Sequence, residues 1–299
     1  MSLVKKSGLG PEKNFLGIED ENLYSYEQAK YVIQSAPYEY TSSYLAGSAR
    51  GPEAILEASH FVEFYDEAVD FEAYHAGIAT LAAMSFENKV DAEAVDIIEE
   101  NTTALLNDDK FVISLGAEHT VTSGFVRAYA KKFNDLSVLQ LDAHSDLREA
   151  YQGNKYSHAS VMARVKELGL KITQIGIRAQ EKAEAEVIRA SPHINTFYAY
   201  QIRSNNNWMQ EAVETLSDNV YITIDADGFD PSVIPAVGTA EPGGLYWQET
   251  LDFLKMVCRE KNVVGFDVVE VAPIEGQIIS EFVLAKLVYK IIGFIETNK

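Results

Sequence analysis

Two short segments of the chain bring together side chains that can bind metal ions. In the first, an apolar run ends in Asp142, His144 and Asp146; in the second, a similar run ends in Asp225 and Asp227. Alternate residues of an extended chain point to the same side, so the acids and the histidine of each segment can converge. Carboxylates gathered without a cation repel each other and raise one another's pKa values. The two segments therefore predict a metal site, and the number of acids favours two ions.

Three further polar clusters follow directly on predicted strands. They contain His119, Arg178 and Glu270. In open parallel sheets, ligands bind beyond the carboxyl ends of the strands, so residues far apart in the sequence meet at one edge. We therefore expect a metal site whose ligands are His119, Asp142, His144, Asp146, Asp225 and Asp227.

The chemistry of this ligand set narrows the choice of metal. Structural zinc sites favour cysteine and histidine and close at four ligands, whereas magnesium usually keeps several waters. Oxygen ligands with imidazole suit Mn²⁺, and cobalt, nickel or iron could replace it in vitro. Two divalent ions would balance the four carboxylates, and a hydroxide shared between them would leave the centre close to neutral. Such a pair lowers the pKa of a shared water toward about 7, which would supply a nucleophile at neutral pH.

Composition excludes several kinds of partner. The 299 residues carry a formal net charge of −20, which argues against nucleic acid, whose binding needs a cationic surface. A negative field is compatible with a small cationic substrate. The single cysteine, Cys258, cannot form an internal disulfide. The polar first residues do not resemble a signal peptide, and no apolar run approaches about 20 residues, so we expect a cytoplasmic protein without a membrane segment.

Strand-like and helix-like stretches alternate along the chain. Strands are expected at 31–33, 111–115, 137–141, 172–177, 195–198, 220–224 and 263–269. Helices are expected from residue 51 and at 91–107, 120–132, 160–168, 180–190, 248–261 and 280–295, with Ser280 as a cap. This alternation predicts an α/β fold with a mainly parallel sheet. We expect one catalytic domain at 26–299 after an N-terminal extension at 1–25.

Four motifs occur in order along the chain. They are Gly-Ala-Glu-His at 116–119, Asp-Ala-His-Ser-Asp at 142–146, Asp-Ala-Asp-Gly-Phe-Asp-Pro at 225–231 and Val-Glu-Val-Ala-Pro at 269–273. At these residues, and at Ser-Ala-Arg-Gly-Pro at 48–52, the chain resembles the ureohydrolase family of arginases and agmatinases. The resemblance covers roughly residues 30–295, and such ordered spacing is very specific.

The resemblance implies a three-layer α/β/α sandwich with two Mn²⁺ ions that hydrolyses a guanidine to urea and an amine. It implies that His119 and Asp146 hold one metal, that His144 and Asp227 hold the other, and that Asp142 and Asp225 bridge them; the hydroxide between the metals would attack the guanidine carbon. Three catalytic roles follow from the same resemblance. Glu270 would grip the guanidinium, Asp146 would pass on a proton, and His158 would exchange protons with solvent near neutral pH.

Within the family, residues 238–245 and 265–271 look most like agmatinases. Leu147 and Arg148 stand where arginases have an asparagine that helps to hold arginine. The expected reaction is therefore agmatine and water to putrescine and urea, a step of polyamine biosynthesis. Ala117 and Ala159 replace glycines that are usual beside the pocket, so N1-aminopropylagmatine, guanidinobutyrate and arginine stay open as substrates. Trimers and hexamers are common in the family, so we expect a homo-oligomer.

Other interpretations of these residues remain. Acids at strand ends often cap helices or turns. Glu270 could pair with Arg148 or Arg178, and His158 could be a structural histidine of a loop. A relative could also keep the metals only to bind a ligand or a partner chain. A binuclear phosphoesterase would want more basic residues around the metals than Arg148 alone.

Overall fold

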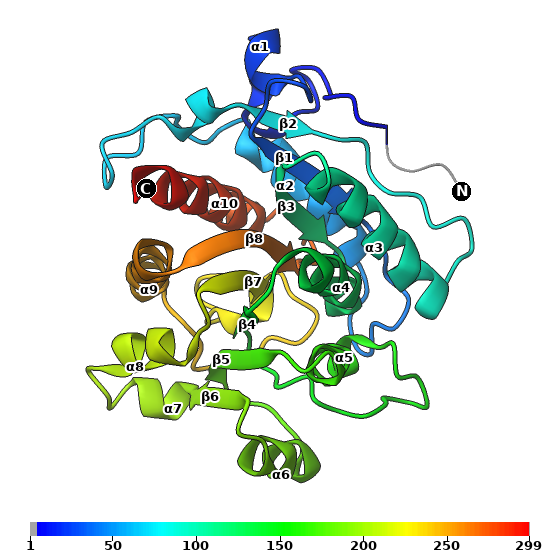
Figure 1. Ribbon diagram of the computed structural model, residues 1–299, viewed down its shortest axis with the longest axis vertical. Coiled ribbons are helices and arrows are strands. Elements are labelled where there is room, and N and C mark those ends of the chain that lie inside the picture. Colours follow the sequence, from blue (N-terminus) through cyan, green and yellow to red (C-terminus); the bar gives the residue numbers. More distant parts are fainter. Residues whose placement is uncertain (1–4, 299) are drawn as a thin grey trace.

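A computed structural model describes residues 5–298, whose core is one parallel β-sheet (Figure 1). The strands lie in the order β2-β1-β3-β8-β7-β4-β5-β6, and every pairing between them is parallel. The predicted parallel sheet is thus confirmed. Their bounds are β1 (Tyr31–Ala36), β2 (Ile78–Thr80), β3 (Phe111–Gly116), β4 (Leu136–Leu141), β5 (Lys171–Ile177), β6 (Ile194–Tyr198), β7 (Asn219–Asp225) and β8 (Asn262–Val269).

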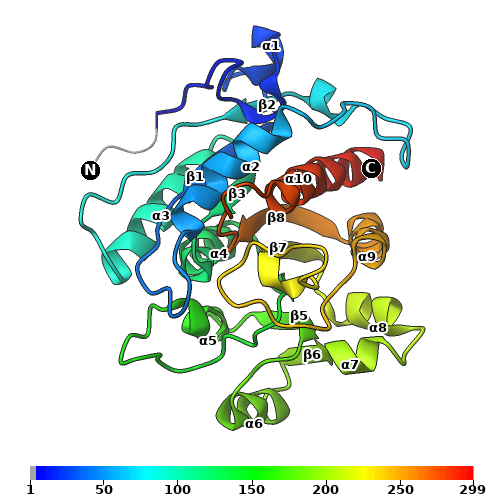
Figure 2. The ribbon, with the colours of Figure 1, turned by 180° about the vertical axis from the view of Figure 1, so that it is seen from behind.

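Helices cover both faces of the sheet, which gives the expected three layers (Figures 1 and 2). One face is covered by α2 (Gly51–Ser59), α8 (Trp208–Thr215), α9 (Trp247–Glu260) and α10 (Ile279–Thr297). The other is covered by α3 (Ala92–Leu106), α4 (Thr122–Lys132), α5 (Val161–Glu167) and α6 (Lys182–Ala190). The short helices are α1 (Glu21–Tyr24), α7 (Ala199–Ile202) and the 3-10 turns η1 (Phe15–Gly17), η2 (Ser48–Arg50), η3 (Ala73–Ala76), η4 (His119–Val121), η5 (His158–Ser160) and η6 (Ala226–Gly228). Within residues 5–298, no helix has the length and apolar character needed to cross a membrane.

The two helical layers bury two hydrophobic clusters against the sheet. In β4, Leu139 and Leu141 face the cluster under α8 to α10, whereas Val138 faces the cluster under α3 to α6. Strands buried on both faces need apolar residues at consecutive positions, which explains their nearly continuous hydrophobic runs. The predicted cap of the last helix is wrong: Ser280 lies inside α10, and its hydroxyl accepts a hydrogen bond from the backbone N–H of Ala236 at 3.0 Å.

The first part of the chain packs on this core. Phe15, Leu16 and Ile18 are buried in the cluster that includes α2 and α10. The backbone N–H of Phe15 also donates to the hydroxyl of Thr80 in β2, at 2.8 Å. Residues 15–18 therefore contribute to the hydrophobic core of the sheet, although they precede the expected catalytic domain.

One row of side chains across the sheet is polar although it is buried. It takes one residue from each strand except β2, and the strand register aligns them. Four of the six neighbouring pairs in the row share hydrogen bonds of 2.7–2.9 Å, as between Thr223 and Asp267 or between Gln174 and Gln140. We call this set the polar row; in sheet order it consists of Gln34, Ser114, Asp267, Thr223, Gln140, Gln174 and Thr196.

Candidate metal centre

The strand register places two of the proposed ligands side by side. Leu141 of β4 is aligned with Ile224 of β7, so Asp142 and Asp225 follow at the same level on neighbouring strands. Neighbouring strands lie about 4.8 Å apart, which brings the two carboxylates within reach of one ion. Both residues stand two positions beyond a member of the polar row, on the same face of the sheet. The site therefore lies at the carboxyl edge of the sheet, as the sequence predicts.

Two groups of ligand atoms gather at this edge. His119, Asp142 and Asp225 form one group, and Asp142, His144 and Asp227 form the other; within each, the ligand atoms lie within 4.8 Å of one another. Asp142 belongs to both groups. This sharing is the arrangement expected of a carboxylate between two ions.

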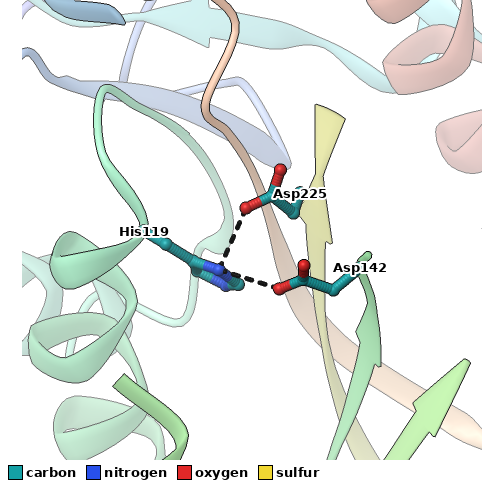
Figure 3. A group of neighbouring side chains, drawn as sticks. All are labelled: His119, Asp142 and Asp225. Atoms are coloured by element: carbon teal, nitrogen blue, oxygen red, sulfur yellow. Dashed lines mark ion pairs between the residues drawn. The ribbon is translucent and has the colours of Figure 1, made fainter. Parts of the chain in front are cut away.

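His119 shows most directly that a cation belongs here. Its Nδ1 lies 3.1 Å from Asp142 Oδ2, 3.1 Å from Asp146 Oδ2 and 3.2 Å from Asp225 Oδ2, and Figure 3 shows two of these approaches. The imidazole is fully buried, and Nδ1 makes no hydrogen bond. A nitrogen lone pair faced by three carboxylate oxygens is unfavourable, and a cation between them relieves the repulsion.

The other ring nitrogen of His119 is held by the polar row. Thr223 donates its hydroxyl proton to Asp267 Oδ1 at 2.7 Å, so its oxygen accepts from Nε2–H of His119, at 2.9 Å. In neutral His119 the lone pair is then on Nδ1, which points at the carboxylates. Fixing the tautomer of a metal-binding histidine through its second nitrogen is the usual task of such a partner.

The pKa values of these groups also indicate a missing positive charge. Burial raises the pKa of Asp225 well above its ordinary value, and Asp227 and Asp142 add to the rise. Burial and then Asp142 raise the pKa of Asp146 to about 7. Burial lowers the pKa of His119, but the surrounding carboxylates outweigh it and raise this pKa well above its usual range. The residues present fit divalent cations, which would relieve the repulsion among the carboxylates.

Short contacts fix the second group of ligand atoms. His144 Nδ1 lies 3.0 Å from Asp227 Oδ2, and the other oxygen of Asp227 accepts from the backbone N–H of Ala143 at 3.1 Å. The turn that carries Asp227 packs against the end of β4 at Gly228. A Cβ at Gly228 would lie 2.8 Å from the backbone nitrogen of Asp142, so no larger residue fits without moving a proposed ligand.

Replacing Thr223 by valine should weaken metal binding without changing a ligand. Valine keeps the shape of the side chain but removes the hydroxyl that orients His119, and losses of this kind are about 10- to 100-fold in metal affinity. Titration of the metal-free protein with Mn²⁺ measures the effect. The matched control is Thr173→Val in β5, because Thr173 is also buried and, among residues 5–298, its hydroxyl pairs only with that of Thr215. Equal Mn²⁺ affinity in both variants would contradict the role of Thr223.

Two proposed catalytic residues have an unusual backbone conformation. Asp146 has φ = 53° and Glu270 has φ = 65°, a left-handed region that side chains other than glycine seldom adopt. Strain of this kind costs about 1–3 kcal/mol per residue and concentrates at functional sites. At Glu270 the conformation ends β8 and brings Oε1 to the backbone N–H of His119, at 2.6 Å. Burial, reinforced by nearby Glu118, raises the pKa of Glu270 to about 8.

A cavity of about 310 Å³ opens over these residues. Glu270 and His158 line it together with His119, His144, Asp146, Asp225 and Asp227, and the fully buried Asp142 lies behind them. The structure therefore brings all the proposed site residues to one place.

His158 lies on the wall of this cavity. Its Nδ1 is 3.1 Å from the hydroxyl of Thr41, and its Nε2 is 3.5 Å from the hydroxyl of Ser43. Burial, together with His144 and His119, lowers the pKa of His158 to about 4. This direction runs against the expectation that His158 titrates near neutrality, and it favours a neutral ring at pH 7 that can accept a proton.

Arg148 and Arg178 bind groups other than Glu270, the partner that the sequence left open for them. The guanidinium of Arg178 donates to backbone carbonyls, among them those of Asp227 at 2.6 Å and Glu241 at 2.9 Å, and so ties a ligand turn to residues 238–244. Arg148 pairs with Glu181 at 3.0 Å. Neither arginine forms an ion pair with Glu270 among residues 5–298. Sequence patterns do not reveal the partners of Arg178, because backbone carbonyls leave no residue signature.

This chain is similar to known proteins of one family, both in sequence and in structure. The model of the arginase family matches residues 29–293. The chain is 43% identical to an N(1)-aminopropylagmatine ureohydrolase of Synechocystis sp., over 95% of this chain and 94% of that protein, and 35% identical to an agmatinase of Bacillus cereus, over 84% and 86%. Among solved structures, the agmatine ureohydrolase of Thermoplasma volcanium superposes with a TM-score of 0.84 at 34% identity and covers 95% of this chain and 94% of that one.

Proposed function

Because this chain belongs to the arginase family, we propose that it is a metal-dependent ureohydrolase that converts agmatine and water into putrescine and urea. One observation carries the proposal: five of the six metal-type ligands and the half-buried carboxylate of Glu270 line a single cavity, and the sixth ligand, Asp142, lies directly behind it. The family relationship makes the reaction class a hydrolysis at an amidine carbon–nitrogen bond.

Two divalent ions, for which we propose Mn²⁺, would be held by the six ligands. His119 and Asp146 would bind the first ion, His144 and Asp227 the second, and Asp142 and Asp225 both. Ions bound there would acidify a water molecule toward a pKa of about 7 and offset the negative charge that develops at the reacting guanidine. The six donors are oxygen and imidazole nitrogen, which suits Mn²⁺ better than a thiolate site would.

Glu270 would hold the substrate guanidinium. One of its oxygens accepts from the backbone N–H of His119, which fixes the carboxylate at the floor of the cavity. Burial makes ionisation of this carboxylate unfavourable, and a bound cation would reverse that effect because opposite charges stabilise each other. Asp146 and the neutral ring of His158 are then the groups placed to take up and return protons as the amine leaves.

The outer part of the cavity suits a substrate with a cationic tail. The charge of Arg148 is balanced by Glu181. Glu241 also lines the cavity, and its carboxylate has no hydrogen bond or ion pair with any residue between 5 and 298. A free carboxylate near the mouth favours the ammonium end of agmatine over the carboxylate end of arginine or guanidinobutyrate.

N1-aminopropylagmatine is the second candidate substrate. The 43% identity to a protein of that name favours it, and its tail is likewise cationic. Both candidates share the guanidinium that Glu270 would bind, so they differ only in the groups beyond it.

A substrate panel with Mn²⁺ tests the proposal. Urea release should be at least about 100-fold more efficient, as kcat/KM, with agmatine or N1-aminopropylagmatine than with arginine or guanidinobutyrate, because a carboxylate tail meets uncompensated negative charge. Higher efficiency with N1-aminopropylagmatine than with agmatine would select the second candidate. If none of the four compounds releases urea while each chain binds two ions, the protein is a metal-binding relative that lacks this activity.

We propose further that the protein acts in polyamine synthesis in the cytoplasm, as a homo-oligomeric trimer or hexamer with one catalytic domain at residues 26–299. The proposed product, putrescine, is the link to polyamines. Light scattering of the purified protein and fractionation of the source cells measure the oligomer and the location.

A further inference from the structure

A buried acid beside the metal centre holds a loop of the cavity wall. The carboxylate of Glu118 is fully buried and accepts hydrogen bonds from the backbone N–H of Tyr40 at 2.9 Å, from the backbone N–H of Thr41 at 2.6 Å and from the hydroxyl of Thr41 at 3.0 Å. Burial raises the pKa of Glu118, and these donors oppose the rise. Glu118 thereby joins the segment after β1 to the segment after β3.

Thr41 connects Glu118 to His158. The hydroxyl oxygen of Thr41 also accepts from the backbone N–H of His158 at 3.1 Å and lies 3.1 Å from Nδ1 of its ring. A hydroxyl has one proton to donate, and Thr41 donates it to Oε1 of Glu118. The Nδ1 atom of His158 must then be the donor, so the neutral ring carries its proton on Nδ1.

We infer that Thr41 and Glu118 are positioning residues that fix the tautomer of His158, and this inference rests on the proposed function. With the proton on Nδ1, the lone pair of His158 is on Nε2, next to Ser43 of the cavity wall. This is the tautomer that can accept a proton from the cavity. Tyr151 holds the ring edge-on, with ring centroids 5.6 Å apart.

The same carboxylate–threonine–histidine arrangement occurs at the metal centre. There Asp267 receives the proton of Thr223, and Thr223 accepts from His119. In both cases the carboxylate determines the direction of the hydroxyl, and the hydroxyl determines the tautomer of the ring. A ring in the other tautomer presents N–H where a lone pair is needed, which removes its function without displacing it.

Removing the hydroxyl of Thr41 is the first test. Thr41→Val should lower kcat for urea release about 10- to 100-fold, which is less than the full contribution of a proton-transfer group. KM and the number of bound ions should change little. Thr41→Ser restores the hydroxyl and should recover most of the lost activity. Ser42→Ala is the control on the same loop, because Ser42 donates to Glu39 and not to His158. An unchanged kcat in Thr41→Val would overturn the inference.

A double-mutant cycle shows whether Thr41 acts through His158. The variant that combines Thr41→Val with His158→Ala should be no slower than His158→Ala alone, because the positioned ring is already absent. If the loss in kcat of the double variant equals the product of the two single losses, Thr41 acts independently of His158, which would contradict the inference. Melting temperatures of all variants identify any that fail to fold.

Nitrogen NMR of the histidine rings tests the tautomer without any turnover. In protein loaded with diamagnetic Mg²⁺ or Zn²⁺, Nδ1 of His158 should carry the proton, with the resonance assigned from its loss in His158→Ala. Glu118→Gln can donate its amide proton to Thr41, which turns the hydroxyl toward His158 and should move the ring proton to Nε2. A proton on Nε2 in the unmodified protein would contradict the inference even if urea release is normal. If no substrate releases urea, the proposed function is wrong, but the spectrum still shows which ring nitrogen of His158 carries the proton.

Discussion

Replacing Asp142 by asparagine is expected to abolish urea release and to reduce the bound Mn²⁺ from two ions per chain to one or none. Asp142 is the carboxylate common to both groups of ligand atoms, so its neutralisation weakens both ions together. Removing one partner of a buried charge pair costs about 3–5 kcal/mol, which corresponds to roughly 150- to 5000-fold in affinity. Elemental analysis of the dialysed protein and a urea assay measure the two effects.

Thermal unfolding separates this loss from misfolding. Without metal, the variant should still unfold cooperatively but at a lower temperature, because His119 and His144 outweigh burial and lower the pKa of Asp142, so its ionised carboxylate stabilises the fold. The rise in melting temperature that Mn²⁺ gives to the unmodified protein should disappear, since a ligand stabilises only what it binds. Asp252→Asn is the control, because Asp252 is exposed and its carboxylate accepts a hydrogen bond from the side chain of Gln248 on the same surface helix. An Asp142→Asn protein that still binds two ions would refute the shared ligand.

Glu270→Gln is expected to leave both metal ions in place and to remove most of the catalytic efficiency. Glutamine keeps the size of the side chain and can still accept from His119, but it has no charge for the guanidinium. Loss of one partner of a buried charge pair in a complex costs about 2–5 kcal/mol, or roughly 30- to 5000-fold in kcat/KM.

The expected stability of the Glu270→Gln variant makes this result easy to interpret. Burial raises the pKa of Glu270 to about 8, so the neutral amide removes an unfavourable charge and the protein should melt no lower than before. Glu275→Gln, in the exposed loop that follows, is the matched control. A kcat/KM within about twofold of normal at full metal content would mean that the guanidinium binds elsewhere.

The parallel sheet and the gathering of the ligands follow from patterns that the sequence shows directly. Apolar runs end in acids at Asp142 and Asp225, and parallel strands bring such ends to one edge. β2 (Ile78–Thr80), a strand of three residues, was not predicted. The helices α7 and α8 were missed as well; they have four and eight residues, and tertiary contacts decide whether such short segments are helical.

Other parts of the site depend on loops whose conformation no local pattern encodes. The contact of Thr41 with His158 joins residues 117 positions apart, and Glu118 reaches 77 positions back to Thr41. A loop is held by hydrogen bonds to its backbone, and almost any residue type supplies those groups. The low pKa of His158 has the same origin, because it reflects burial that only the folded chain creates.

The polar row also constrains how the chain can fold. If β4 slipped by one residue against β7, Gln140 and Asp142 would turn toward the hydrophobic cluster under α8 to α10 and lose their partners in the polar row and the site. Each such buried group left without a partner costs about 1–3 kcal/mol, so misaligned sheets lose more free energy than an all-apolar sheet would. The side chains that hold the metal ligands therefore also select the correct alignment of the strands, and a mutation in this row risks trapping the chain in a wrong pairing as well as weakening the catalyst.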